Sequence, residues 1–213
     1  MSVSSSKEVI LKKIRKALSE STPLPFPQSE GTSSVYHPAQ KELEIQFAEE
    51  FSKLQGKFAF CLDLTELCQQ LNLLIIEKNW SNIFCNETAL KQTLTAGAFA
   101  GFSGTTLADC DASITSCESL VARTGSIVLS TASQSGRTVS VYAPVHICVA
   151  FTRQLVYDIK DALQLLKEKY GPDMPSLISF ASGPSRTADI EKTLVTGVHG
   201  PKEVYVFLVD DPR

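Results

Sequence analysis

A polar turn late in the chain holds the residue types that a small anionic ligand needs. This turn, residues 182–191, follows an apolar segment at residues 177–180. Its second half overlaps a segment with helical features, residues 187–195. Ligands of open α/β sheets bind at the carboxyl ends of strands, and free N–H groups at a helix start attract anions. Arg186 adds a planar fork that fits a carboxylate or phosphate, so the sequence predicts an anion site here. Its candidate residues are Ser182, Gly183, Ser185, Arg186 and Thr187.

The same turn also fits a structural role. Asp189 and Glu191 fall in the first turn of the expected helix, where negative charge is favourable, and Ser185 or Thr187 could cap that helix. Arg186 would then be an ordinary surface charge. If the turn is catalytic instead, Asp189 and Glu191 are the carboxylates that could assist proton transfer.

One histidine lies in a constrained turn that follows this segment. His199 stands between Val198 and Gly200 within a Gly-Val-His-Gly-Pro sequence that begins at Gly197. An ordinary histidine titrates near neutral pH, so His199 could act as a general acid or base, or contact an anion together with Gly200. A loop histidine without a chemical role is the alternative.

Two further small-residue turns flank the apolar run at residues 127–129. Thr124, Gly125 and Ser126 precede this run, and Arg137 follows it within a turn rich in Ser and Gly. If one of these turns lies at the ligand end of the sheet, Gly125, Ser126 or Arg137 joins the anion site. Neither turn matches a P-loop or a GxGxxG pattern, so neither supports nucleotide binding by those devices.

The six cysteines form no recognisable metal or cluster site. None of them belongs to a C-x-x-C pair, and their intervals match no zinc or iron–sulfur pattern. His146 and Cys148 share one face of an expected strand, but their apolar run favours a core histidine over a metal ligand. We therefore expect free thiols, no metal and no cofactor bound through a motif of this chain.

Composition limits the classes of protein to which this chain can belong. Its 213 residues are 43% hydrophobic and 20% charged, which excludes a disordered or collagen-like chain. The net charge of −3 gives no overall basic field for nucleic acid or an anionic membrane. No apolar run approaches the ~20 residues that span a bilayer, and charged residues interrupt the N-terminus where a secretory signal would be apolar. We expect a soluble protein of the cytoplasm.

Apolar periodicity predicts strands that alternate with helices. The expected helices are residues 4–20, 43–54, 64–74, 87–94, 155–169 and 187–195. The expected strands are residues 58–62, 82–85, 127–129, 145–151, 177–180 and 204–209. This alternation indicates an α/β fold with a single open, mostly parallel sheet and helices on both faces.

Prolines separate the first helix from the rest of the chain. Alternating prolines within residues 21–31 exclude a helix and favour an extended strap. We therefore expect residues 1–38 to form a helical arm on a semi-rigid tether, and residues 39–213 to form the α/β domain. The arm's apolar stripe predicts docking on its own domain or on a partner, with a disordered tail as the alternative.

Several segments resemble the LUD-domain family, in its lactate-utilisation protein C (YkgG) group. Residues 183–191 and 197–201 are similar to the C-terminal signature of this family, and residues 124–129 are similar to its central T-G-[ST] strand. Residues 144–147 resemble its P-x-H-I strand, and residues 10–18 resemble its N-terminal helix. The resemblance extends over nearly the whole chain.

This resemblance implies both a fold and a role. The fold would be similar to the ribose-phosphate isomerase/CoA-transferase superfamily. The role would lie in the oxidation of L-lactate to pyruvate beside two iron–sulfur partner proteins, with the clusters in those partners. One position departs from the pattern, because Arg123 stands where many family members have an acidic residue.

Three functions are compatible with these observations. The leading one is a non-redox subunit of a lactate-oxidising system that binds a small carboxylate or phosphate-bearing ligand at the turns described above. The second is a free-standing isomerase or transferase for a phosphorylated or CoA-linked metabolite, with His199 as acid or base. The third is a structural or regulatory subunit without chemistry, whose N-terminal arm docks on a partner. In the first and third, the chain is a subunit and not a self-sufficient enzyme.

Overall fold

The structure is a computed structural model that describes residues 6–19, 38–39, 41–188 and 194–211. The chain divides into two units, Met1–Pro38 and Ala39–Arg213. In the first unit, α1 (Ser6–Ser19) confirms the helix expected near the N-terminus, and Ile10 and Ile14 of its apolar stripe are exposed. The expected proline strap at residues 21–31 lies outside the described residues. Within the described ranges, no helix is long and apolar enough to cross a bilayer.

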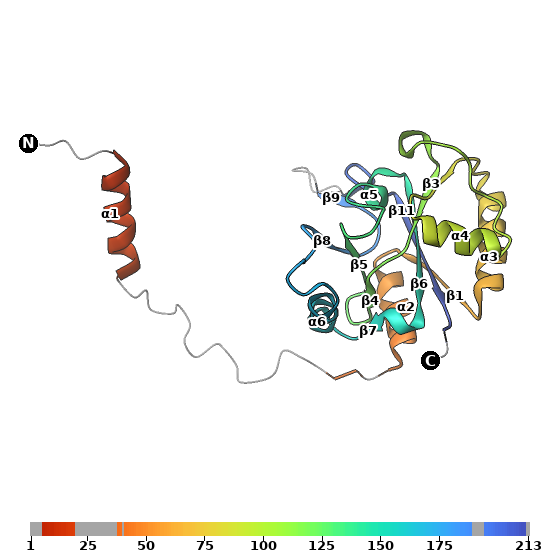
Figure 1. Cartoon of the computed structure of the whole chain (residues 1–213), viewed down its shortest axis with the longest axis horizontal. Helices are drawn as coiled ribbons and strands as arrows, with labels where there is room; N and C mark the ends of the chain where they lie inside the picture. The colour runs from red at the N-terminus through yellow and green to blue at the C-terminus, as the bar shows by residue number, and fades with distance from the viewer. Residues whose placement is uncertain (1–5, 20–37, 40, 189–193, 212–213) are drawn as a thin grey trace, which may run out of the picture. The chain divides into compact units, whose positions relative to one another are not determined.

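A five-stranded parallel sheet forms the centre of the second unit (Figure 1). Its order is β1-β11-β6-β3-β2, and every neighbouring pair is parallel. The strands are β1 (Lys57–Cys61), β2 (Ile83–Phe84), β3 (Ala112–Thr115), β6 (Val145–Phe151) and β11 (Glu203–Val209). The nearly continuous apolarity of β6 suits its central place, since all of its residues except Phe151 are buried. The expected α/β class and mostly parallel sheet are confirmed.

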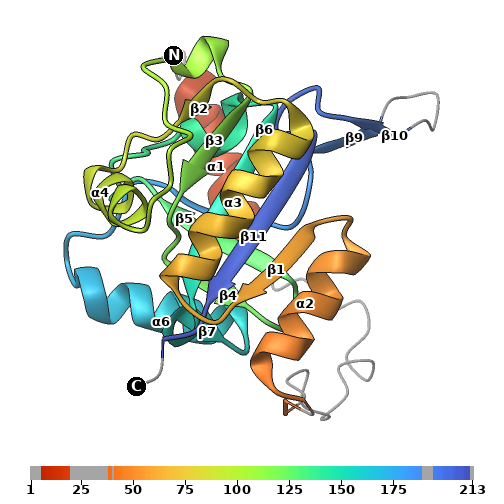
Figure 2. The same ribbon diagram turned by 90° about the vertical axis from the view of Figure 1, so that its right-hand side faces the viewer.

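Two helices cover one face of this sheet. α3 (Leu64–Lys78) and α4 (Thr88–Ala96) pack on it through apolar side chains such as Leu67, Leu71 and Leu94. Figure 2 shows α3 crossing the sheet in front of β11. This helix begins where the sequence predicts, because the Asp63 side chain accepts a hydrogen bond from the N–H of Glu66.

A second sheet, made of four short strands, packs on the other face. Its order is β7-β4-β5-β8, with β4 (Ser119–Val121), β5 (Ser126–Ser130), β7 (Leu155–Val156) and β8 (Ile178–Ala181). With α2 (Leu43–Lys53), it shares an apolar core with the first sheet around Phe47, Phe51 and Val206, and α6 (Ile159–Tyr170) covers its outer face. The strands expected in one sheet are thus divided between two, and β5 and β8 pair antiparallel. Strands of two to five residues carry too little periodicity to separate two sheets from sequence.

The helix α6 begins four residues later than its apolar spacing suggests. Leu155–Val156 pairs with β4 as a strand, and Asp158 then caps α6 by accepting a hydrogen bond from Lys160 N, while Asp158 N donates to the Asp161 side chain. The remaining short helices are η1 (Leu107–Asp109), α5 (Val139–Tyr142) and η2 (Thr152–Gln154).

The segment expected to form the last helix contains a β-hairpin instead. β9 (Arg186–Ala188) and β10 (Leu194–Thr196) pair as antiparallel strands, and residues 189–193 between them lie outside the described residues. Threonine and valine are frequent in these two strands, and β-branched residues favour extended backbone. The N–H of Gly197 also donates to the carbonyl of Ser185 (3.0 Å), which extends the ladder. The helix predicted over residues 187–195 is therefore wrong.

Candidate functional site

Two of the predicted turns meet near the end of α2, and a third is bonded to one of them. The hydroxyl of Ser126, at the start of β5, lies 2.8 Å from that of Thr124 and 2.7 Å from that of Ser182, which follows β8. The N–H of Ser185 donates to the carbonyl of Pro201 (2.9 Å), in the turn before β11. Hydrogen bonds thus join polar residues from distant parts of the chain. We refer to Thr124, Ser126, Ser182, Ser185 and Arg186 as the turn cluster.

Two of the predicted glycines allow these turns to approach α2 closely. Gly125 (φ +57°) and Gly183 (φ +81°) have left-handed backbone, which favours glycine. A Cβ on Gly125 would lie 2.6 Å from Phe51 N, and a Cβ on Gly183 would lie 2.6 Å from Leu54 O. Both turns are therefore positioned by direct contact with the backbone at the end of α2.

Arg186 reaches the same end of α2. Its Nη2 donates a hydrogen bond to the carbonyl of Leu54, the residue that ends this helix. Carbonyl groups at a helix end lack intrahelical partners and carry partial negative charge, so a guanidinium is favourable there. Arg186 is nevertheless exposed, and a guanidinium has five N–H donors. The side chain can therefore hold α2 with one N–H group and present others to a ligand.

The remaining predicted residues of this region lie in or beside the hairpin. Gly200 packs against the turn cluster, since a Cβ there would lie 2.9 Å from that of Ser185. His199 is exposed in the same turn, and Thr187 belongs to β9. The two candidate carboxylates, Asp189 and Glu191, lie outside the described residues.

Arg137 is not brought to the turn cluster. Its Nη2 donates to Ser176 Oγ (2.8 Å). Ser176 lies beyond the Ser130 end of β5, whereas Ser126 begins the strand at its other end. The two turns that flank β5 are therefore separated by the length of a five-residue strand, about 15 Å. The sequence predicted that one of these two turns joins the candidate anion site. The turn of Gly125 and Ser126 lies beside Ser182, and the turn of Arg137 does not.

The turn cluster lies at the amino end of the parallel sheet. Lys202 N donates to Pro144 O (2.8 Å), directly before β11 and β6 begin, and the cluster is bonded to the same turn. Ligands bind at the carboxyl ends of strands in open parallel sheets. The strand β8, which leads into Ser182, belongs to the second sheet and pairs antiparallel with β5, so this rule does not apply to it. The sequence thus identified residues that converge, but it placed them at the wrong end of the main sheet.

An ion pair supports the Thr124 turn from the side of α6. Arg123 Nε lies 2.6 Å from Asp158 Oδ2, and Asp158 is buried. Burial acts to raise the pKa of Asp158, but the Arg123 guanidinium and the amide hydrogens at the start of α6 outweigh it, so this pKa is below its ordinary value. The acidic partner of Arg123 thus comes from the cap of α6.

We expect Asp158→Asn to lower the free energy of unfolding by about 1 kcal/mol at pH 7. Asparagine keeps an oxygen that can cap α6, but it leaves Arg123 without a carboxylate. Because the folded pKa is lowered, the stabilisation is complete above ~pH 4 and is lost as the pH falls through that lower value. Urea unfolding at pH 7 and at acid pH checks this, since a pH-independent difference between the two proteins would contradict the ion pair.

A buried carboxylate that the sequence analysis missed lies at the carboxyl end of the parallel sheet. Glu87, which follows β2, is 7% exposed and accepts hydrogen bonds from Ser116 N (3.1 Å), Ser116 Oγ (2.5 Å) and Ser135 Oγ (2.7 Å). These two serines follow β3 and β5, so one side chain ties three connections together. The sequence signal was weak, because a glutamate at the start of a helix is usually exposed.

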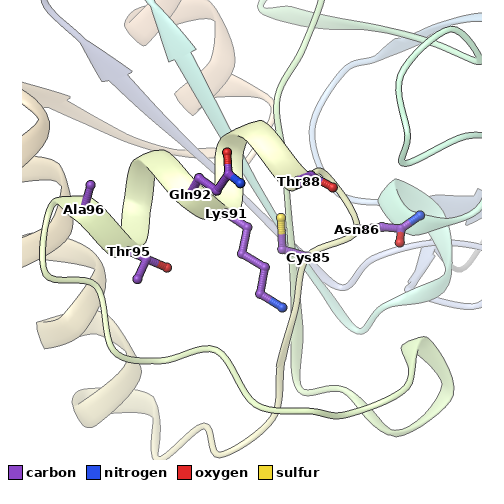
Figure 3. A pocket seen from close by; sticks show the side chains of 7 residues that line it. All are labelled: Cys85, Asn86, Thr88, Lys91, Gln92, Thr95 and Ala96. Atoms are coloured by element: carbon purple, nitrogen blue, oxygen red, sulfur yellow. The ribbon is translucent and has the colours of Figure 1, made fainter.

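A cavity of about 600 Å³ runs along α4, from the segment before this helix to its last residue. Figure 3 shows its lining side chains coming from α4 and from the residues that lead into it. They are Cys85, Asn86, Thr88, Lys91, Gln92, Thr95 and Ala96. Burial raises the pKa of the Cys85 thiol to about 11, so this thiol is protonated at neutral pH. The predicted ligand residues do not line this cavity.

His146 lies in the core of the protein. It is 1% exposed, and its Nε2 lies 2.8 Å from Thr115 Oγ1. Burial lowers the pKa of His146 to about 4, so its imidazole is neutral at physiological pH. The apolar strand around His146 correctly favoured a core histidine with a satisfied hydrogen bond.

Residues 103–209, half of the chain, match the family model for the LUD domain, and this match includes the whole turn cluster. Over 103 residues, the chain is 36% identical to Lactate utilization protein C 1 of Bacillus mycoides. The aligned region covers 47% of this chain and 44% of that protein. Over 100 residues, the chain is 35% identical to Lactate utilization protein C of Bacillus subtilis, and the aligned region covers 46% of this chain and 42% of that protein. The chain thus spans less than half the length of these relatives.

The fold resembles that of a solved structure over most of the chain. A crystal structure of a DUF162 family protein from Deinococcus radiodurans matches with a TM-score of 0.59, and the match covers 81% of this chain and 99% of that chain. At 20% sequence identity, the likeness shows the fold alone. It supports the α/β architecture described above.

Proposed function

This chain belongs to the LUD domain family, and we propose that it is a component of an L-lactate utilisation system and binds a small carboxylate ligand. The relatives from two Bacillus species, both named for lactate utilisation, support the role in such a system. The ligand site rests on one observation. The Ser126–Ser182 hydrogen bond (2.7 Å) joins two separate turns next to the segment that carries an exposed guanidinium.

The turn cluster and His199 in the adjoining turn offer the groups that a 2-hydroxy or 2-oxo acid requires. The carboxylate would accept two parallel hydrogen bonds from N–H groups of Arg186 that do not contact Leu54. The hydroxyl or keto oxygen beside that carboxylate would pair with Ser182 Oγ or with the exposed imidazole of His199. Lactate and pyruvate share the carboxylate, so such a site would accept both.

We place the electron acceptors of this system in iron–sulfur partner proteins. Conversion of lactate to pyruvate removes two electrons and two protons from the substrate, and the cysteine spacing of this chain matches no cluster-binding pattern. The chain would then be the non-redox subunit, which binds or presents the organic acid.

Calorimetric titration of the full chain with L-lactate and with pyruvate tests this function. We expect wild type to bind at least one of the two acids, and Arg186→Ala to bind at least tenfold more weakly, a loss of about 1.4 kcal/mol or more. His199→Gln changes an exposed side chain and should also weaken binding without affecting the fold. Urea unfolding shows whether each variant is folded under the conditions of the titration.

Arg137→Ala is the matched control for Arg186→Ala. It removes the same side chain from the far end of β5, where Arg137 is bonded to Ser176. We expect it to bind both acids as wild type does. Equal binding by wild type and a folded Arg186→Ala variant would remove Arg186 from the site, and binding of neither acid by wild type would overturn the proposed ligand class.

A further inference from the structure

Two of the six free cysteines form a pair between the sheets. Cys148 lies in β6 and is fully buried, whereas Cys117 lies in the connection between β3 and β4 and is half-buried. Both belong to the apolar core that the two sheets share. Cys148 pairs across β6 and β3 with Thr115, which is two residues before Cys117, and the two thiols interact with each other. The two sulfur atoms are therefore neighbours, although the residues are far apart in the sequence.

The backbone around Cys117 is held on both sides. Its carbonyl accepts a hydrogen bond from Gln154 Nε2 (2.6 Å). The N–H of the preceding residue, Ser116, is bound to Glu87, and the N–H of the following residue, Glu118, donates to Val128 O (2.8 Å). The contact between the thiols is thus built into the fold and does not depend on a loose loop.

Cys117 also faces a small cavity, and Cys148 does not. The cavity has a volume of about 160 Å³ and is lined by Cys117 with polar side chains that include Glu118, Ser133, Lys169 and Tyr170. A water molecule occupies roughly 30 Å³ in the liquid, so the cavity has room for a molecule as small as a peroxide. Small polar oxidants can therefore reach Cys117 but not the buried Cys148.

We propose that Cys117 and Cys148 form a reversible disulfide when a peroxide reaches this cavity. The thiolate of Cys117 attacks one peroxide oxygen, the O–O bond breaks, and a sulfenic acid and hydroxide result; with a proton from solvent, the hydroxide leaves as water. The sulfur of Cys148 then attacks the sulfenic sulfur, the S–O bond breaks, and the second water leaves with the Cys148 proton. In sum, two thiols and one hydrogen peroxide give one disulfide and two waters.

The environment of each thiol fits this order of events. The neighbouring Cys117 thiol and complete burial raise the pKa of Cys148 well above its ordinary value, so Cys148 is a thiol at neutral pH and is not the sulfur that meets the peroxide first. Lys169, Ser130 and Tyr170 donate to the Glu118 carboxylate beside Cys117, and these bonds outweigh burial and lower the pKa of Glu118. The cavity is thus lined by polar groups, with which a peroxide can form hydrogen bonds.

This disulfide would connect the thiol chemistry to the turn cluster. The connection that carries Cys117 leads through β4 to Thr124, so the disulfide would fix the chain just upstream of the proposed ligand site. It would also close a loop between β6 and the β3–β4 connection and thereby restrict the unfolded chain. We expect the oxidised protein to melt about 5 °C or more above the reduced protein.

Peptide mapping by mass spectrometry tests the proposal on the full, folded chain. Reduced protein is treated with hydrogen peroxide, its remaining thiols are alkylated without a reductant, and it is then digested. We expect a cross-linked peptide pair that contains Cys117 and Cys148, and we expect dithiothreitol to abolish it. Cys117→Ser and Cys148→Ser should each abolish the cross-link, and Cys110→Ser, which alters another free thiol, should retain it.

Three results would overturn the proposal, and none of them depends on the variants folding. The first is a wild-type protein in which Cys117 is oxidised to sulfinic acid without a cross-link to Cys148. The second is a cross-link between other cysteines in place of this pair. The third is a protein whose thiols all remain reactive toward alkylation after peroxide treatment. The site and its test are separate from the lactate titrations, so either proposal can fail alone.

Discussion

Gly125→Ala and Gly183→Ala are each expected to lower the free energy of unfolding by about 3 kcal/mol or more. Both glycines have a left-handed backbone, which costs an alanine about 1 kcal/mol or more. In addition, each new methyl group would lie 2.6 Å from a backbone atom at the end of α2. A backbone atom cannot rotate away as a side chain can, so the turn or the helix must move. Urea unfolding of the full chain measures the loss.

Gly136→Ala is the matched control for these variants. Gly136 also has a positive φ angle, +60°, and among the described residues outside its chain neighbours no atom would lie within 4 Å of an added Cβ. This control therefore carries the backbone strain alone, and we expect it to cost about 1 kcal/mol. The difference between this loss and the losses at Gly125 and Gly183 isolates the contact with α2. Equal losses at all three positions would contradict the close packing of the predicted turns on this helix.

Glu87→Ala is expected to destabilise the protein by about 3 kcal/mol. The substitution removes the acceptor of three hydrogen bonds in a buried position and leaves the N–H of Ser116 without its partner. A buried N–H without an acceptor costs about 1–3 kcal/mol, and the lost side chain adds a cavity. Glu87→Gln should cost less than alanine but more than nothing, because an amide offers one acceptor oxygen where the carboxylate offers two.

Glu168→Ala serves as the control for charge and size. Glu168 is exposed on α6 and accepts a hydrogen bond only from Gln164 among the described residues, so we expect its loss to cost within about 0.5 kcal/mol. Thermal or urea unfolding compares the two variants with wild type. If Glu87→Ala were as stable as Glu168→Ala, Glu87 would not tie together the connections after β2, β3 and β5.

Much of the parallel sheet could be predicted because its signals are local and strong. The run of apolar residues in β6 is long enough to identify a strand buried on both faces, and Asp63 with Glu66 marks the start of α3 within the sequence itself. Such features depend on neighbours in the sequence, and the sequence shows those neighbours directly. The glycines at 125 and 183 were named only as candidate ligand residues, a role that stays a prediction, and their left-handed backbone was not predicted.

The errors arose where long-range packing decides the structure. Acidic residues and a preceding Ser-Arg-Thr made residues 187–195 look like the start of a helix, but strand pairing with Thr196 and the bond from Gly197 to Ser185 select a hairpin. Arg137 has the right chemistry for an anion, yet its place depends on which way β5 runs in the second sheet. The buried position of Glu87 could not be predicted, because it depends on hydrogen bonds from Ser116 and Ser135, which lie far from Glu87 in the sequence.

If the turns around Ser126, Ser182 and Arg186 form one ligand site, amide NMR spectra of the full chain will show it directly. We predict that titration with L-lactate or pyruvate shifts the amide signals of these residues with a saturable dependence on ligand concentration. The signals of Gly136, beyond the far end of β5, and of Lys91, in the cavity of Figure 3, should stay unchanged. Saturable shifts confined to the Lys91 cavity, or none with either acid, would contradict the proposed site.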